Sequence, residues 1–193
     1  MVLKITKLGE DILRETAKPV EVIDDKIRQL AEDMFETMIE ADGVGLAAPQ
    51  IGLSMRMFVL IADDNVRRVF INPQIIKTSE EMSNYDEGCL SIPQVYETIS
   101  RPARVTVQAF NEKGKPFTLD ADGFLARIIQ HEYDHLNGVV FIDKGDKDFA
   151  EKTIAQFKKR AERAAEKQKA KDAKAAKIAA KIAAKEAKKA EKN

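Results

Sequence analysis

The composition of the chain changes sharply near residue 147, and this change limits the part that can form a packed core. Beyond residue 165 the sequence is mostly Ala, Lys and Glu, and KIAAKIAAKEAK places a lysine every four positions. Such a segment favours helix but offers few apolar side chains to bury. Only the body that precedes the change near residue 147, about 150 residues, can bury a sizeable core. We therefore expect one domain at residues 1–148 and a basic helical extension at residues 149–193.

The two parts also differ in charge, although the formal net charge is zero. Residues 151–193 carry 15 Lys and Arg against six Asp and Glu, whereas residues 1–150 carry 17 against 26, which gives +9 and −9. An acidic body joined to a basic tail suggests that the tail contacts a polyanion or an acidic surface. The alternative is a solvated helical appendage that aids solubility. No aromatic residue follows Phe157, so stacking on bases is not expected and backbone charge would dominate.

Hydrophobic spacing predicts two helices in the body. Over residues 25–42 apolar side chains recur at spacings of three and four, and Asp24 or Asp25 can cap the start. The stretch DGFLARIIQHEYDHLNG at 122–138 predicts a second helix, which begins near Asp122.

The strand pattern decides the expected fold class. Strands are expected at 56–63, 67–75, 104–110, 116–122 and 138–144, and the third and fourth flank NEKGK as a hairpin. Residues 43–52, with three glycines and a proline, are expected to form a loop. Because no regular βαβ alternation occurs, we expect an α+β fold. It would have largely antiparallel sheets packed around the helix at 122–138, and a long C-terminal helix.

The only cysteine, Cys89, cannot form an intramolecular disulfide. Its role is open among a buried apolar filler, a nucleophile and a metal ligand. A fold without disulfides fits a reducing compartment. No apolar run approaches the ~18 residues that span a bilayer, and the first residues have no apolar signal region. We expect a cytoplasmic location and no membrane partner.

The only two histidines, His131 and His135, both lie in QHEYDH. A separation of four places both rings on one face of a helix. His-Glu-x-x-His on a helix is the arrangement of many zinc hydrolases, with Glu132 as the general base. The alternative is two half-buried histidines bonded to backbone. A catalytic metal needs about three protein ligands and one open position. No histidine lies downstream, so Cys89 is the natural third ligand, and the helix at 122–138 would be the central metal-binding element.

Three motifs occur in order: GVGLAAPQ at 43–50, EGCLS at 87–91 and QHEYDHLNG at 130–138. Together they resemble those of the peptide deformylases, and the resemblance covers roughly residues 1–145. It implies removal of the formyl group from the N-terminal N-formylmethionine of newly made polypeptides, giving formate and a free amine. It also implies one divalent metal held by Cys89, His131 and His135. Ferrous iron is the metal expected in the cell, and Zn²⁺, Ni²⁺ or Co²⁺ can substitute.

The resemblance further implies catalytic roles for three residues. Metal-bound water would attack the formyl carbon, with Glu132 as general base and then acid. The side-chain amide of Gln50 and the backbone N–H of Leu90 would stabilise the oxyanion. From the residues alone, the favoured interpretation of Gln50 is a loop residue that bonds its own backbone, and the motif context reverses this preference.

The resemblance also implies a set of substrate-binding residues: Gly43, Val44, Gly45, Glu87, Arg101 and Ile128. Val44 and Gly45 would pair with the peptide as an added strand. Val44 and Ile128 are candidates for an apolar methionine pocket, although Ile128 can equally be ordinary core. Arg101 stands where family members carry a substrate-side arginine, and a solvated surface role is the alternative.

One position departs from the family pattern, because Gln94 stands where members often have glycine after Ser-Ile-Pro. This departure leaves the metal ligands intact but can alter the rim of the cleft. The expected partners are N-formylmethionyl nascent chains and, through the basic tail, the ribosome; specific DNA binding is not expected. Two other functions stay open: a metalloprotease, which would cleave unformylated peptides, and a non-catalytic ribosome- or RNA-binding module. That module would close its structural metal with a fourth protein ligand.

Overall fold

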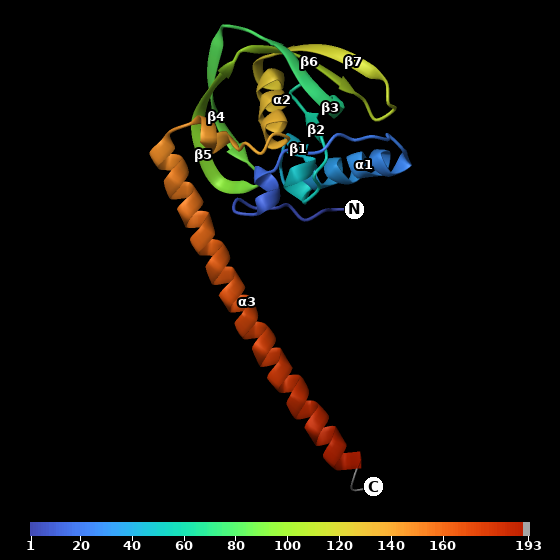
Figure 1. Cartoon of the computed structure of the whole chain (residues 1–193), viewed down its shortest axis with the longest axis vertical. Coiled ribbons are helices and arrows are strands. Elements are labelled where there is room, and N and C mark those ends of the chain that lie inside the picture. The colour runs from blue at the N-terminus through green and yellow to red at the C-terminus, as the bar shows by residue number, and fades with distance from the viewer. Residues whose placement is uncertain (191–193) are drawn as a thin grey trace. The chain divides into compact units, whose positions relative to one another are not determined.

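The computed structural model describes residues 1–190, with side chains described as far as residue 177. The chain divides into two compact units, Met1–Glu151 and a second that begins at Lys152 (Figure 1). In chain order the elements are the 3₁₀ helix η1 (Asp11–Arg14), α1 (Asp25–Glu40), β1 (Gly45–Ala47), the 3₁₀ helix η2 (Ala48–Ile51), β2 (Met57–Ile61), β3 (Arg67–Thr78), β4 (Met82–Cys89), β5 (Ile92–Pro102), β6 (Arg104–Phe110), β7 (Pro116–Asp122), α2 (Gly123–His135), the 3₁₀ helix η3 (Phe141–Lys144) and α3 (Lys147–Ala190).

The strands form two antiparallel sheets. The larger sheet has the order β1-β2-β3-β6-β7, and the smaller consists of β4 and β5. The hairpin expected around NEKGK is present, with Phe110 opposite Pro116 and Arg104 opposite Asp122. The expectation of a mixed fold of helices and antiparallel sheets, with a long C-terminal helix, is confirmed.

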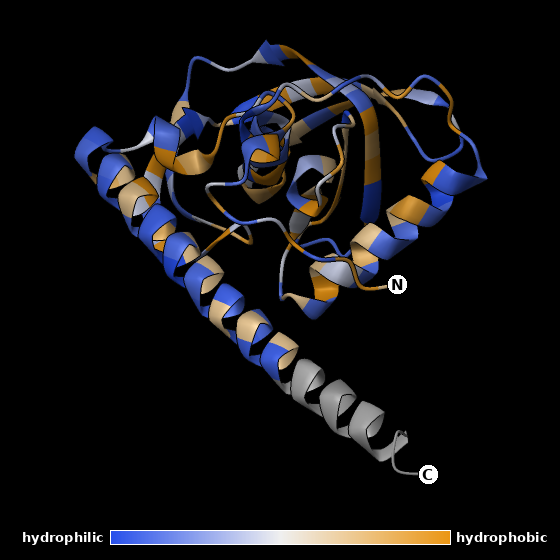
Figure 2. Ribbon diagram, turned by 60° about the horizontal axis from the view of Figure 1, so that its bottom comes forward, coloured by the Kyte–Doolittle hydropathy of each residue, from blue (hydrophilic) through white to orange (hydrophobic). Residues whose placement is uncertain are grey.

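Helix α1 covers part of the larger sheet. Asp24 caps it, because its carboxylate accepts hydrogen bonds from the backbone N–H groups of Lys26 and Ile27. Its apolar face, which includes Met34 and Met38, is buried in one hydrophobic cluster with β2 and β3. The alternation of apolar and polar colours along α1 in Figure 2 follows from this one-sided burial.

Helix α2 occupies the middle of the body (Figure 1). Ala126, Ile128 and Ile129 pack into a second cluster with residues of β2, β3, β6 and β7, including Phe58 and Phe70, whose rings stack 4.6 Å apart. A helix buried so deeply carries its polar side chains into the core. Those polar groups must find partners or coordinate an ion.

Three expectations for the body were wrong or incomplete. Residues 138–144 form no strand. Residues Phe141–Lys144 form η3, in which Phe141 and Ile142 are buried, and a short apolar run does not distinguish a buried strand from a buried helical turn. The expected loop at 43–52 contains β1 and η2. The β4–β5 hairpin was not predicted, and Cys89 is the last residue of β4.

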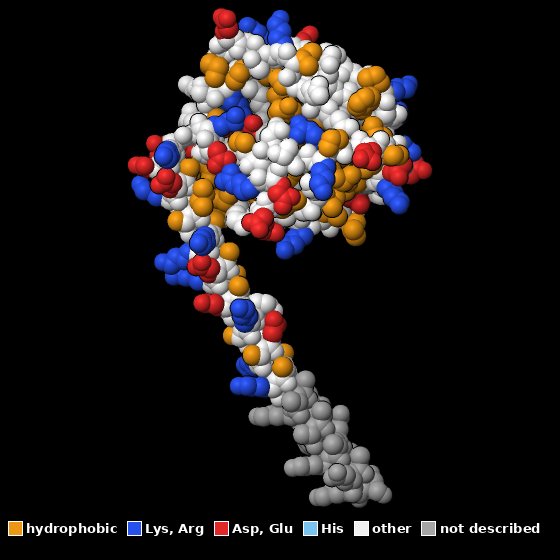
Figure 3. Space-filling view, viewed as in Figure 1, with side chains coloured by type: hydrophobic (Ala, Val, Ile, Leu, Met, Phe, Trp, Pro, Cys, Tyr) orange, Lys and Arg blue, Asp and Glu red, His pale blue; other side chains and the backbone are white. Residues whose placement is uncertain are grey.

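Helix α3 extends over residues 147–190, as the composition predicts. From Lys158 to Lys177 every side chain is exposed, and Figure 3 shows Lys, Arg, Asp and Glu along this stretch. No helix among residues 1–190 is both long enough and apolar enough to cross a membrane.

Candidate metal centre

Cys89, His131 and His135 come together at one point. The smaller sheet brings the Cys89 sulfur to the last turn of α2, where Sγ lies 3.3 Å from Nε2 of His135. One ligand atom from each of the three residues lies within 4.8 Å of the other two. A soft thiolate with two imidazoles is a known ligand set for a catalytic divalent metal. The set leaves a coordination position open, so the residues present fit such an ion.

The electrostatics of the centre favour a ligating thiolate. Burial raises the pKa of the Cys89 thiol, but the adjacent His135 and His131 outweigh burial and hold this pKa well below its ordinary value. Because the thiolate is the form that binds metal, Cys89 is already in the state that a cation needs. A buried filler cysteine would have no such neighbours.

Glu87, on β4, orients the first histidine. Its Oε2 accepts a hydrogen bond from Nδ1 of His131 at 2.8 Å, so the ring carries its proton there and Nε2 is left for a ligand. Arg101 donates to both carboxylate oxygens, at 2.6 and 2.9 Å, and Arg127 donates to Oε1 at 2.8 Å. Burial raises the pKa of Glu87, but the hydrogen bonds from Arg101 and His131 outweigh burial and keep it far below the usual range. The carboxylate therefore stays charged.

Glu132 is placed to accept and release a proton. It is 3 % exposed, and its Oε2 has no hydrogen-bond partner within the described part of the chain. Burial is the main cause that raises its pKa, to about 7. A carboxyl group with this pKa exchanges protons readily near neutral pH. Gly45 makes room for it, because a Cβ built on Gly45 would overlap the Glu132 carboxylate and lie 2.9 Å from Cγ2 of Ile128.

Gln50, in η2, presents its amide nitrogen to the centre. Its Oε1 accepts a hydrogen bond from the N–H of Ala47 at 2.8 Å, and a backbone N–H can only donate. The amide orientation is therefore fixed, and Nε2 lies 3.4 Å from Sγ of Cys89 and 3.3 Å from Oγ of Ser91. Leu90 lies in the tight turn between Cys89 and Ser91. The loop alternative for Gln50 is half right, since one end of the side chain does bond nearby backbone.

Known proteins with similar sequences point to one family. The family model described as polypeptide deformylase matches residues 2–150. The chain belongs to the polypeptide deformylase family. It is therefore a metal-dependent hydrolase. A peptide deformylase of Treponema pallidum (strain Nichols) is 48% identical over 155 residues, which are 80% of this chain and 95% of the relative.

Solved structures of peptide deformylases resemble this fold. The one from Legionella pneumophila has a TM-score of 0.75 and 41% identity, and covers 84% of this chain and 99% of its own. The one from Synechococcus elongatus, in complex with actinonin, has a TM-score of 0.74 and 46% identity, and covers 77% of this chain and 81% of its own.

A small cavity of about 180 Å³ opens beside the centre. Val44 and Ile128 line it together with Phe124, and His131 and Glu132 form its inner wall. Gly45, on β1, borders it through its contact with Glu132. Gly43 packs against Leu90, because a Cβ there would lie 2.7 Å from Cδ1 of Leu90. The structure thus places Val44, Gly45 and Ile128 at this cavity, whereas a substrate-binding role for Gly43 stays a prediction.

Arg101 lies elsewhere than expected. Its side chain is 3 % exposed, does not line the cavity, and bonds Glu87 and also Asp134 at 2.6 Å. The alternative of a solvated surface role is wrong, since Arg101 is buried between two carboxylates. Glu87 does line the cavity, but its oxygens are engaged by two arginines and His131. These bonds occupy both carboxylate oxygens of Glu87, and a substrate-binding role for either residue stays a prediction.

Several residues of the site were not anticipated from the sequence. They are Ser91, Arg127 and Asp134, which bond Gln50, Glu87 and Arg101 respectively. Arg127 carried a usable signal, because an arginine inside the apolar run LARII requires a buried acidic partner. Ser91 and Asp134 lie inside two of the three motifs, so the motifs themselves marked them.

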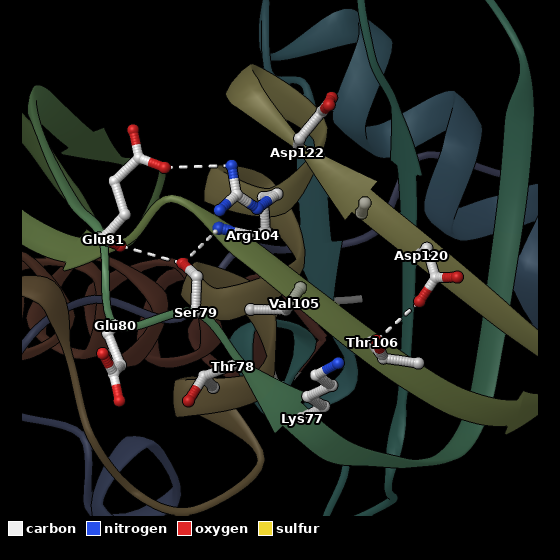
Figure 4. A pocket seen from close by; sticks show the side chains of 11 residues that line it. Lys77, Thr78, Ser79, Glu80, Glu81, Arg104, Val105, Thr106, Asp120 and Asp122 are labelled. Atoms are coloured by element: carbon white, nitrogen blue, oxygen red, sulfur yellow. Dashed lines mark hydrogen bonds and ion pairs between the residues drawn. The ribbon is translucent and has the colours of Figure 1, made fainter.

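A larger hollow of about 830 Å³ lies elsewhere, where the ends of β3, β6 and β7 meet (Figure 4). It shares no residue with the metal centre. Its polar side chains bond one another: Arg104 pairs with Glu81 at 2.9 Å, and Thr106 donates to Asp120 at 2.6 Å. Because the candidate metal ligands lie at the smaller cavity beside Glu132, that cavity is the one relevant to the reaction.

Proposed function

We propose that this chain removes the formyl group from the N-terminal N-formylmethionine of newly made polypeptides, giving formate and a free amine. The observation that carries the proposal is the meeting of Cys89, His131 and His135. Two groups lie beside them: the buried acid Glu132 and the amide nitrogen of Gln50.

The ligand set supports one divalent metal held by Cys89, His131 and His135. A cation bound there supplies Lewis-acid chemistry, because it lowers the pKa of a water in its open position and polarises the formyl oxygen. We propose Fe²⁺ in the cell, with Zn²⁺, Ni²⁺ or Co²⁺ as substitutes, since a thiolate with two imidazoles suits all four. A thiolate ligated to iron is sensitive to oxidation, so oxygen-free handling matters.

Three groups of the chain perform the remaining chemistry. Glu132 accepts the proton of the attacking water and delivers it to the amine nitrogen as the C–N bond breaks. Nε2 of Gln50 and the backbone N–H of Leu90 donate to the oxygen that becomes negative when the carbonyl carbon turns tetrahedral. Because neither donor carries a full charge, they favour the transition state without holding formate tightly.

The substrate would enter along β1. This strand is the edge of the larger sheet, so Val44 and Gly45 can pair with an extended peptide through main-chain hydrogen bonds. The methionine side chain fits the cavity lined by Val44 and Ile128. Recognition of later residues through main chain tolerates many sequences, as nascent chains require.

We further propose that residues 1–148 are the catalytic domain, and that the extension at 149–193 binds the ribosome. The reaction would take place in the cytoplasm, where formylated chains emerge. Over residues 152–177, helix geometry places most basic side chains on about one third of the circumference of α3. They are Lys152, Lys159, Arg160, Arg163, Lys167, Lys171, Lys174 and Lys177. The acids of the same stretch, Glu162, Glu166 and Asp172, lie outside this basic face. Such a face suits the phosphates of RNA.

The test is formate release from formyl-Met-Ala-Ser by protein purified without oxygen and loaded with iron. Glu132→Gln keeps the shape of the side chain but cannot accept the proton, and it should lower kcat by roughly 10²–10⁴-fold. Glu112→Gln, on the partly exposed turn between β6 and β7, is the matched control and should match the wild type. Cleavage of unformylated Met-Ala-Ser would indicate a protease. No release, with one metal bound per chain, would contradict the proposal.

A further inference from the structure

The two oxyanion donors come from different sheets. Gln50 follows β1 of the larger sheet, whereas Leu90 lies in the turn between β4 and β5 of the smaller one. Strand pairing therefore does not set the distance between the two turns. Oxyanion donors act only when they are held within about 0.5 Å of the productive geometry. Besides the contacts of the Gln50 amide with Cys89 and Ser91, other parts of the chain can hold the two turns in place.

The segment Thr6–Leu8 bonds both turns. On the Gln50 side, the N–H of Thr6 donates to the carbonyl of Gln50 at 2.8 Å, and Oγ1 of Thr6 donates to the carbonyl of Pro49 at 3.1 Å. On the other side, the N–H of Leu8 donates to the carbonyl of Ser91 at 3.0 Å. Thr6 and Leu8 are buried, which anchors this bridge. In Figure 1 it belongs to the dark blue trace that leaves the N label.

Lys7 adds a contact to the very residue that supplies one donor. Its Nζ lies 2.8 Å from the carbonyl oxygen of Leu90. A hydrogen bond from an ammonium group is stronger than one between neutral groups. This hydrogen bond restrains the peptide plane between Leu90 and Ser91. It thereby also restrains the turn that contains the N–H of Leu90. The side chain of Lys7 is itself exposed, so it contributes little to the packed core.

We propose that Lys7 and Thr6 are positioning residues for oxyanion stabilisation, because they tie the Leu90 turn to the Gln50 turn. This inference rests on the proposed deformylase reaction. It assigns the segment Thr6–Leu8 a role in the transition state, beyond its packing on the body. Loss of the tie should lower kcat and leave KM unchanged, since the oxyanion forms only after the substrate has bound.

The first test compares Lys7→Met, Lys7→Arg and Lys4→Met in the full-length, metal-loaded enzyme. Lys4 is an exposed lysine two residues before the segment Thr6–Leu8, and it serves as the matched control. Lys7→Met should lower kcat about 5- to 10-fold with KM and Tm unchanged. Lys7→Arg keeps a cationic donor and should restore kcat to within about twofold, and Lys4→Met should equal the wild type.

A second pair of variants tests the other turn. Thr6→Val keeps the shape of the side chain but loses the bond to Pro49, whereas Thr6→Ser keeps the hydroxyl. We expect Thr6→Val, but not Thr6→Ser, to lower kcat about 3- to 10-fold. Amide NMR of the zinc-loaded protein gives a readout independent of activity. The Leu90 N–H resonance should shift in Lys7→Met and stay in place in Lys4→Met.

The outcomes separate this inference from the proposed reaction. If the wild type releases formate but Lys7→Met behaves like Lys4→Met, the positioning role is wrong and the reaction stands. A rise in KM with unchanged kcat would show that Lys7 contacts the substrate, which also overturns the inference. If the wild type itself releases no formate, the proposed reaction fails. The NMR experiment then still tests the contact of Lys7 with the Leu90 turn, and an unshifted Leu90 resonance in Lys7→Met would show that Lys7 does not hold this turn.

Discussion

At the scale of single residues, Gln94 holds a backbone conformation that suits glycine. Its φ is +63°, in the left-handed region, which costs a residue with a Cβ about 1–2 kcal/mol. Glycine relieves this strain but loses more chain entropy on folding, by about 0.5–1 kcal/mol. Gln94→Gly should therefore stabilise the protein by up to about 1 kcal/mol, as measured by urea unfolding. The matched change Gln108→Gly, in the exposed face of β6, should destabilise it. Equal effects of the two would contradict the strain at Gln94.

The proposed role of Glu132 predicts an acid limit on the reaction. A carboxylate acts as a base only when deprotonated, and burial raises the pKa of Glu132 to about 7. A cation at the neighbouring ligands adds positive charge, which favours the carboxylate and lowers this pKa. kcat/KM should therefore fall as the pH drops, with a midpoint between the ordinary value of 4.5 and about 7. The profile is recorded with metal content checked at each pH. A flat profile across that window, with metal retained, would argue against Glu132 as the base.

At the scale of elements, the Glu87 network connects the smaller sheet to α2. Arg101 on β5 bonds Glu87 on β4 and Asp134 on α2, and all three side chains are largely buried. Arg101→Met leaves two carboxylates short of a partner and should destabilise the protein by about 3–5 kcal/mol. Metal affinity should fall about 10- to 100-fold, because Glu87 orients His131.

Two variants control for simple loss of charge in that network. Arg101→Lys cannot reproduce the two parallel bonds to Glu87, so it should not restore metal affinity. Arg104→Met removes an exposed arginine paired with the exposed Glu81 and should change stability by less than about 0.5 kcal/mol. Metal titration and urea unfolding measure both effects. Full recovery in Arg101→Lys would mean that charge alone matters.

The same network shows what sequence patterns can and cannot predict. Helix α1, helix α2 and the β6–β7 hairpin were predictable, because each has its periodicity or turn signal within its own residues. The β4–β5 hairpin has few buried positions, so no apolar alternation marks it. The candidate metal ligands were recognisable through their motifs. Glu87 bonds residues 14, 40 and 44 positions away, and such pairings are set by the fold and not by local spacing.

At the scale of the whole molecule, the basic face of α3 makes a prediction that net charge alone does not. Lys167 and Lys174 lie near the middle of that face, whereas Lys158 and Lys169 lie on the opposite side of the helix. Lys167→Glu/Lys174→Glu and Lys158→Glu/Lys169→Glu change the charge equally. Only the first pair should weaken binding to ribosomes, and it should reduce the salt dependence by roughly two units of log–log slope.

The measurement is cosedimentation with ribosomes over a range of salt, with formate release from a free formylated tripeptide as the internal control. Release should be the same in both double variants, because the changed residues lie outside residues 1–148. Equal weakening by the two pairs would mean that total charge, and not a face, attracts the ribosome. Unchanged ribosome binding by both double variants would indicate that α3 is a solvated appendage. The catalytic domain would then reach nascent chains by diffusion.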